Sequence, residues 1–223
     1  LSLVGSEMCI RDRAVGAKAK NTPKHPKAPP AMDGAFLLPR PLATARSKTM
    51  ANALLIIDMQ TGLYDGPQQP FERERVLGTI NQLIQRARRA NVAIFVARHT
   101  GPAGSPIEAG SPLWQLWHGL DVDDAHDHLF NKTRPSCFLG TDLAQQLAAA
   151  QVDELVVVGM KTQFCIDTTC RVAVELGFTV VLPEDAHTCM DTPTLPAKAI
   201  IEHHNATLAG AFVKRVKAQD VEF

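Results

Sequence analysis

The chain has 223 residues, which is the size of one ordinary domain with room for an extension. It holds 23 lysines and arginines against 23 aspartates and glutamates, so its composition offers no basic face for nucleic acid. Its apolar runs are far shorter than the roughly 20 residues of a membrane-spanning helix. We therefore expect a soluble protein that binds neither nucleic acid nor a membrane.

The five cysteines form no C-x-x-C pair and no short cluster with histidine of the kind that holds structural zinc. Their odd number, in a chain long enough to build a core, also argues against a disulfide scaffold. We therefore expect a reducing compartment and a cytoplasmic protein. Three of the cysteines, Cys137, Cys170 and Cys189, we interpret as packing residues, because none begins a helix beside a candidate base.

Residues 1–49 differ from the rest of the chain. They are rich in Pro, Lys, Arg and Ala and show no periodic apolar pattern, so we expect them to be disordered. The first thirteen, LSLVGSEMCIRDR, resemble a peptide produced when sequencing-adapter DNA is translated by mistake. A targeting peptide is the alternative, but the prolines of residues 22–30 would break its amphipathic helix. Met50 is our candidate for the true start of a domain that spans residues 50–223.

From residue 50 onward, apolar runs typical of strands alternate with helical patterns. Strands are predicted at 53–57, 92–97, 154–158, 178–182 and 211–216. Helices are predicted at 72–90, 141–151, 163–176 and 193–208, with Thr141 as an N-cap and Gly177 as a terminator. Strands separated by helices predict an α/β protein with a mostly parallel, doubly wound sheet in three αβα layers.

Three polar residues follow apolar runs, at the edge of such a sheet where ligands bind. Asp58 follows residues 55–57, Lys132 follows residues 129–131, and Cys165 begins a helix after residues 156–159. Each has a plain alternative: Asp58 could form a turn, Lys132 could be solvated, and Cys165 could be a small buried apolar residue. Together, however, they provide a base, a cation and a nucleophile.

Cys165 is the most informative of the three. A thiol on the first turn of a helix feels the partial positive charge of the helix N-terminus, and a nearby cation adds to that effect. We therefore expect the pKa of Cys165 to be lowered. The same backbone amides could hold a developing oxyanion.

These residues lie in segments that resemble the isochorismatase-like cysteine hydrolases, which include nicotinamidases and N-carbamoylsarcosine amidohydrolase. The resemblance covers residues 51–216 and rests on ALLIIDMQTGL, NKTRPSCFLGTDL and VVVGMKTQFCIDTTCRVAVELGF, with Asp58, Lys132 and Cys165 in the matching places. Two later segments, LPEDAHTC and IIEHHNATL, also look like parts of the family. The resemblance implies the family's hydrolase fold.

The resemblance also implies a mechanism. Asp58 takes the proton of Cys165, the thiolate attacks a carbonyl carbon, and water releases the acyl-enzyme. Lys132 stabilises the charge, and the backbone amides of Lys161 and Cys165 form the oxyanion hole. A cis peptide bond is expected between Met160 and Lys161, where it would aim an amide at the oxyanion.

Departures from the relatives bear on the subclass. Nicotinamidases carry an Asp-x-His pair and a second His that hold a divalent metal, whereas this chain has Ala97, Arg98 and His99. We therefore expect no metal and no other cofactor. The loop 100–120 contains both tryptophans, which either wall the pocket, pack against another subunit or simply anchor the loop. The residues expected to line the substrate pocket are Gln60, His99, Trp114, Trp117 and Phe164.

The favoured function is hydrolysis of a C–N bond in a small amide or related molecule. A vinyl-ether hydrolase of the isochorismatase type is the second hypothesis, and it is favoured if Cys165 proves dispensable. A binding protein without catalysis is the third. Because relatives form dimers or larger assemblies and the loop with both tryptophans offers apolar surface, we also expect a homo-oligomer.

Overall fold

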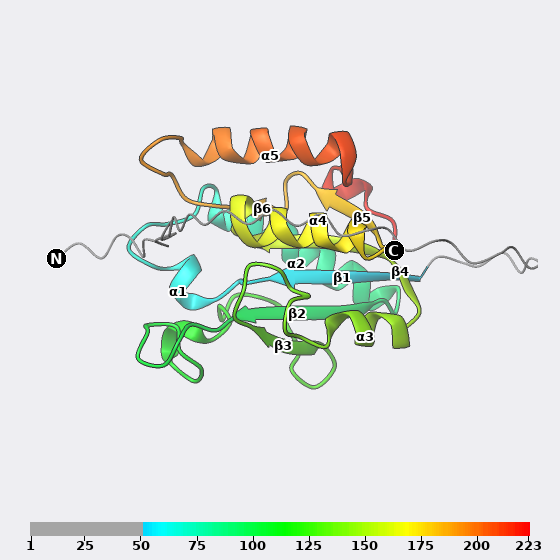
Figure 1. The fold of residues 1–223 in the computed structure, drawn as a ribbon, viewed down its shortest axis with the longest axis horizontal. Helices are drawn as coiled ribbons and strands as arrows, with labels where there is room; N and C mark the ends of the chain where they lie inside the picture. Colours follow the sequence, from blue (N-terminus) through cyan, green and yellow to red (C-terminus); the bar gives the residue numbers. More distant parts are fainter. Residues whose placement is uncertain (1–50) are drawn as a thin grey trace, which may run out of the picture. The chain divides into compact units, whose positions relative to one another are not determined.

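The computed structural model describes residues 51–223 (Figure 1). The expected disorder of residues 1–49, and Cys9 with it, lies outside the described residues. Within the described part, no helix is both long enough and apolar enough to cross a membrane.

One parallel sheet organises the described part of the chain. Its main strands lie in the order β3-β2-β1-β4-β5-β7, and β6 pairs with the end of β4. The strands are β1 (Ala51–Ile57), β2 (Ala93–His99), β3 (His128–Lys132), β4 (Val152–Met160), β5 (Thr179–Pro183), β6 (His187–Thr188) and β7 (Lys214–Val216). The chain winds outward from β1 in one direction and from β4 in the other, so the predicted doubly wound topology is confirmed.

Helices cover both faces of this sheet (Figure 1). They are α1 (Thr61–Tyr64), α2 (Arg73–Arg89), α3 (Leu143–Ala149), α4 (Asp167–Glu175) and α5 (Ala197–Ala211). Leu54 and Ile56 of β1 pack with α2, whereas Leu55 and Ile57 face α3 and α4, because successive strand residues point to opposite faces. Burial on both faces explains the apolar runs at residues 53–57 of β1 and 155–158 of β4.

Some element boundaries differ from those predicted. The predicted helix 163–176 divides into a π-helical turn, Thr162–Ile166, and helix α4. Helix α4 ends shortly before Gly177, which has the left-handed conformation that often follows the end of a helix. Helix α5 begins four residues later than predicted because Leu195 precedes Pro196, and a residue before proline disfavours the helical conformation. Thr141 accepts a hydrogen bond from the amide of Leu143 but lies one residue before the N-cap position of α3.

Candidate active site

The site lies at the carboxyl ends of β1, β3 and β4, beside the point where the winding direction of the sheet reverses. Asp58 follows β1, Lys132 is the last residue of β3, and Cys165 lies in the π-helical turn Thr162–Ile166 after β4. This turn is called the Cys165 turn below. Parallel strands bring their carboxyl ends to one edge, so three residues far apart in sequence meet there.

The ammonium group of Lys132 joins the three side chains. Its Nζ lies 2.8 Å from Asp58 Oδ2 and 3.3 Å from Cys165 Sγ. It also donates to the carbonyl of Arg134 at 3.2 Å and lies 3.4 Å from His99 Nδ1. Asp58 and Lys132 are almost completely buried, and 9% of Cys165 is exposed.

Asp58 is held in an unusual conformation. Its φ of +54° is left-handed, a region that costs a residue with a Cβ of order 1 kcal/mol and that is enriched at functional sites. Its amide donates to the carbonyl of Ala97 at 3.0 Å, which fixes the backbone against β2. The second carboxylate oxygen, Oδ1, is buried and accepts no hydrogen bond from the described residues. A buried acceptor without a partner is costly, so Oδ1 is available for a proton.

Gly159 lets β1 and β4 approach closely beside Asp58. Its φ is +116°, and a Cβ built at this position would lie 2.2 Å from the carbonyl oxygen of Ile57. Neither the conformation nor the spacing admits another residue. The glycine in VVVGM therefore has a steric role at the base of the site.

Burial controls the ionisation of the acid and the amine. It raises the pKa of Asp58, and the ammonium of Lys132 offsets only part of that effect. Burial alone would lower the pKa of Lys132, but the Asp58 carboxylate, together with Cys137 and Cys165, raises the pKa of the amine above its ordinary value. Asp58 is therefore a stronger base than an exposed aspartate, and Lys132 stays a cation.

The expected lowering of the Cys165 pKa is wrong. Burial, and then the negative charge of Asp58, raise the pKa of this thiol to about 12, although Lys132 acts in the opposite direction. The sequence argument considered the helix and the cation but not the depth of the thiol or the carboxylate beside it. In the resting protein the thiol is protonated, so a nearby base has to remove its proton during attack.

The segment that leads into the Cys165 turn has the geometry that the resemblance implies. The peptide bond between Met160 and Lys161 is cis. The carbonyl of Lys161 accepts the amides of Phe164 at 3.1 Å and Ile166 at 3.3 Å, which closes the turn. The Lys161 side chain is half-buried, and burial lowers the pKa of its amine.

Gln60 does not line an open pocket. Its side chain is completely buried and forms hydrogen bonds with backbone groups. Its Nε2 donates to the carbonyls of His99 at 3.0 Å and Trp114 at 2.8 Å, and its Oε1 accepts the amide of His99 at 2.7 Å. We therefore correct its assignment: Gln60 holds the end of β2 against the loop 100–120.

The two tryptophans pack within their own domain. Trp114 is 8% exposed, its Nε1 donates to Thr100 Oγ1 at 2.8 Å, and the guanidinium of Arg98 lies over its ring at 3.9 Å. Trp117 packs against Tyr64 with ring centres 4.7 Å apart and a tilt of 33° between the ring planes. The apolar surface expected from these side chains is thus used internally, and the predicted homo-oligomer stays a prediction. Phe164, in contrast, is 53% exposed beside Cys165.

His99 takes part in a group that resembles a metal site. Ligand atoms of Asp58, His99 and Cys165 all lie within 4.8 Å of one another. The Lys132 ammonium, however, is within hydrogen-bonding reach of all three, so a divalent ion between them would have to displace a cation that Asp58 holds. Burial and the charge of Lys132 also lower the pKa of His99, which keeps it neutral. These residues fit an ammonium group and do not fit a divalent metal.

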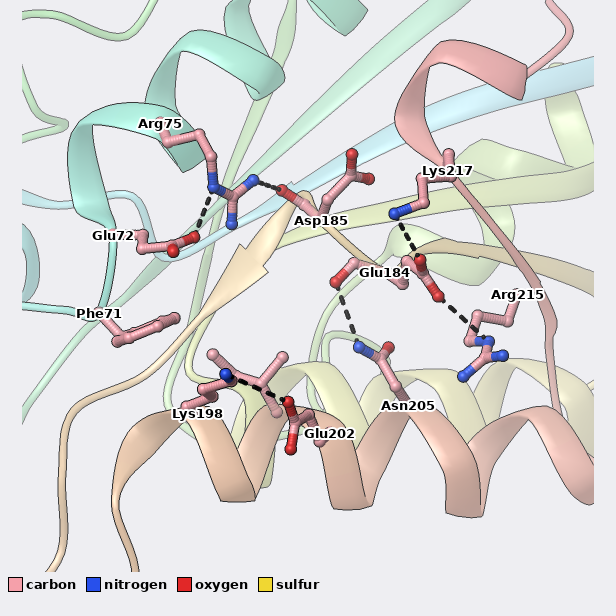
Figure 2. A pocket seen from close by; sticks show the side chains of 11 residues that line it. Phe71, Glu72, Arg75, Glu184, Asp185, Lys198, Glu202, Asn205, Arg215 and Lys217 are labelled. Carbon is pink, nitrogen blue, oxygen red and sulfur yellow. Dashed lines mark hydrogen bonds and ion pairs between the residues drawn. The ribbon is translucent and has the colours of Figure 1, made fainter.

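A groove of about 550 Å³ lies elsewhere, between α2, α5 and β7. Figure 2 shows the side chains that line it. Its charged side chains pair with one another: Glu184 accepts from Lys217 at 3.0 Å and from Arg215 at 3.3 Å, and Arg75 pairs with Glu72. None of Asp58, Lys132 and Cys165 lines it. The side chains in these ion pairs are therefore not free acids or bases.

The fold and this site together define an α/β protein with a buried thiol, carboxylate and ammonium at the switch point of a parallel sheet. The model of the isochorismatase domain matches residues 52–211, and the chain belongs to the isochorismatase family of hydrolases.

Three comparisons illustrate the likeness. A streptothricin hydrolase of Streptomyces noursei is 37% identical over 65% of this chain, and the match spans about half of that relative, 52%. Nicotinamidase 3 of Arabidopsis thaliana is 30% identical over 60% of this chain and 71% of its own length. The crystal structure of a cysteine hydrolase from Pseudomonas syringae pv. phaseolicola superposes with a TM-score of 0.71 and 25% identity, covering 76% of this chain and 89% of that one.

Proposed function

We propose that this protein is a cysteine hydrolase that cleaves a C–N bond of a small amide through a covalent acyl-enzyme. The observation that carries the proposal is the unpaired, buried Oδ1 of Asp58 in a site where one ammonium group contacts both the carboxylate and the thiol. A protonated thiol next to an unsatisfied base is the arrangement that nucleophilic catalysis requires.

In the first half of the reaction, Cys165 Sγ attacks the amide carbon while its proton passes to Asp58. Lys132 stays hydrogen-bonded to the carboxyl group and to the sulfur, so it stabilises the thiolate as it forms. The tetrahedral intermediate then collapses, the C–N bond breaks, and the amine leaves with the proton that Asp58 returns. The acyl group remains on Cys165 as a thioester.

In the second half, Asp58 is again a carboxylate and accepts a proton from water. The resulting hydroxide attacks the thioester carbon, the C–S bond breaks, and the proton held by Asp58 returns to the sulfur. In both halves the negative oxygen of the intermediate is held by the backbone amides of Lys161 and Cys165. No metal or organic cofactor takes part in these steps.

One further feature supports an amide as the substrate, and another supports a reducing compartment. A cysteine nucleophile suits attack on a carbonyl carbon, and one relative is named a nicotinamidase. The described cysteines, Cys137, Cys165, Cys170 and Cys189, are all free thiols, which favours the cytoplasm.

The test is a panel of small amides, ureido acids and lactams, assayed with wild type and Cys165→Ala. Triad members act as a unit, so we expect Cys165→Ala to lose at least about a thousandfold in turnover. Cys170→Ala, the same change at another buried cysteine, is the matched control and should retain activity. Undiminished turnover in Cys165→Ala would remove the covalent mechanism and favour vinyl-ether hydrolysis.

A chemical label gives a measurement that needs no substrate. Cys165 is 9% exposed, whereas Cys137, Cys170 and Cys189 are 0% exposed. Iodoacetamide should therefore modify Cys165 before these three, as peptide mapping by mass spectrometry will determine. Earlier labelling of one of the other three would show that Cys165 is not the accessible thiol.

A further inference from the structure

A buried polar chain connects α5 to the Cys165 turn. His187 of β6 is fully buried, and its two ring nitrogens have different partners. Nε2 lies 3.0 Å from Asn205 Oδ1, and Nδ1 lies 2.9 Å from Thr162 Oγ1. Asn205 Nδ2 in turn donates to the carbonyl of Glu184 at 3.1 Å. Figure 2 shows this last contact in the wall of the groove.

The direction of each hydrogen bond in this series follows from the carbonyl of Glu184, which can only accept a hydrogen bond. Because Asn205 turns its amide nitrogen towards Glu184, its oxygen faces His187 and requires a hydrogen on Nε2. Burial lowers the pKa of His187 to about 4, so the ring is neutral and Nδ1 carries no hydrogen. Nδ1 must then accept from the hydroxyl of Thr162, and all three side chains are satisfied in one arrangement.

This series of hydrogen bonds ends at the Cys165 turn, where the position of the nucleophile matters for the reaction. Thr162 is fully buried, follows Lys161 directly and opens the turn that carries Cys165. His187 is also attached through the sheet, because it pairs with Gly159 in the parallel register of β4 and β6. The turn is thus pinned from the β6 side through both backbone and side chain.

We propose that Thr162, His187 and Asn205 are positioning residues that fix the Cys165 turn against Asp58 and Lys132. The proposal rests on the hydrolase function proposed above, but it concerns residues that touch neither the thiol nor the carboxylate. Displacement of a reacting atom by about 1 Å can reduce the rate about a hundredfold, so a chain that pins this turn acts on the chemical step rather than on substrate binding.

The test compares two substitutions at one position. Thr162→Val removes the hydroxyl and keeps the shape, whereas Thr162→Ser keeps the hydroxyl. With the best amide of the panel, Thr162→Val should lower kcat by at least about tenfold with KM within about twofold, and Thr162→Ser should stay close to wild type. Thr188→Val is the matched control, because its buried hydroxyl donates to the carbonyl of Phe71 and makes no hydrogen bond to the Cys165 turn in the described part of the chain.

Equal kcat values for Thr162→Val and Thr188→Val would overturn the proposal, and so would equal losses in Thr162→Val and Thr162→Ser. Asn205→Leu tests the far end of the chain. It should also lower kcat, and an unchanged kcat would show that α5 takes no part. Thermal melts of every variant identify losses that come from unfolding alone.

A measurement without substrate separates this proposal from the proposed function. The pH dependence of Cys165 alkylation reports the environment of the thiol. In wild type the rate should still be rising at pH 10, whereas Thr162→Val should reach a plateau nearer the ordinary thiol value, because a released turn exposes the sulfur. Identical profiles would contradict the positioning role, even if the protein proved to hydrolyse no amide.

Discussion

Two regions of this protein are rich in charge but satisfy it in different ways. In the groove of Figure 2, the carboxylate of Glu184 is shared by Lys217 and Arg215, whose side chains are exposed. In the site, Asp58 and Lys132 are buried as a pair, and one carboxylate oxygen has no hydrogen-bond partner within residues 51–223. The ion-paired side chains of the groove are satisfied, whereas the site with almost no exposed surface holds a buried oxygen that accepts no hydrogen bond from the described residues. An unsatisfied buried base is the better indicator of chemistry than the volume of a cavity.

The largest effect expected from this contrast is on turnover. Asp58→Asn keeps the size of the side chain but cannot accept the thiol proton, so turnover should fall by at least about a thousandfold. Lys198→Met in the groove removes a charge of an exposed pair and should leave turnover unchanged. Steady-state assays with the most active amide measure both. Comparable losses of turnover in Asp58→Asn and Lys198→Met would show that the site is no more important for catalysis than the groove.

The next effect is on stability. Lys132→Met leaves the Asp58 carboxylate buried without a partner, which should lower the free energy of unfolding by about 3 to 5 kcal/mol. The double variant Asp58→Asn with Lys132→Met removes the stranded charge and should recover part of that loss. Lys217→Met, at an exposed pair, should stay near wild type. Urea denaturation measures all three, and a small loss in Lys132→Met would show that Asp58 is neutral when folded.

His187, between the two regions, gives a smaller and pH-dependent effect. Its pKa is lowered from 6.5 to about 4, so below pH 6.5 the unfolded chain binds a proton that the folded chain excludes. Stability is complete above pH 6.5 and should fall by about 2 kcal/mol from this group between pH 7 and pH 5. Urea denaturation of His187→Gln should lack that decrease. The exposed His203→Gln should retain it, and equal pH dependence in wild type and His187→Gln would contradict the buried neutral ring.

The smallest expected effect is that of a chelator. Because the Lys132 ammonium lies among the three atoms that could ligate a metal, dialysis against a chelator should leave activity unchanged. Activity is measured before and after dialysis, with zinc, iron or manganese added back at stoichiometric amounts. Loss on chelation that one of these metals restores would place the pocket with the metal-dependent nicotinamidases.

The sequence was sufficient for the sheet and for the candidate triad because both depend on local pattern. Apolar runs in β1 and β4 predict buried parallel strands, and the carboxyl ends of such strands meet at one edge, where Asp58, Lys132 and Cys165 lie. Their chemical roles remain proposals. The shift of the Cys165 pKa could not be read in the same way, because it depends on depth of burial and on a carboxylate more than one hundred residues away in the chain.

The roles of residues that act through packing could not be predicted from the sequence either. The loop 100–120 has no periodicity, so nothing in it indicates that Gln60 clamps its backbone or that Trp114 turns inward. The segments LPEDAHTC and IIEHHNATL were noted for their likeness to the family. The pairing of His187 with Asn205 across them appears only when β6 and α5 are placed together.

The central claim is that Cys165 forms a covalent bond to the acyl part of the substrate. The most direct test is to quench wild type during turnover of the best amide and to map the modified peptide by mass spectrometry. The account predicts an added mass equal to the acyl group on the peptide that contains Cys165, lost again as water completes the reaction. Turnover without any adduct on that peptide, together with undiminished activity in Cys165→Ala, would contradict it.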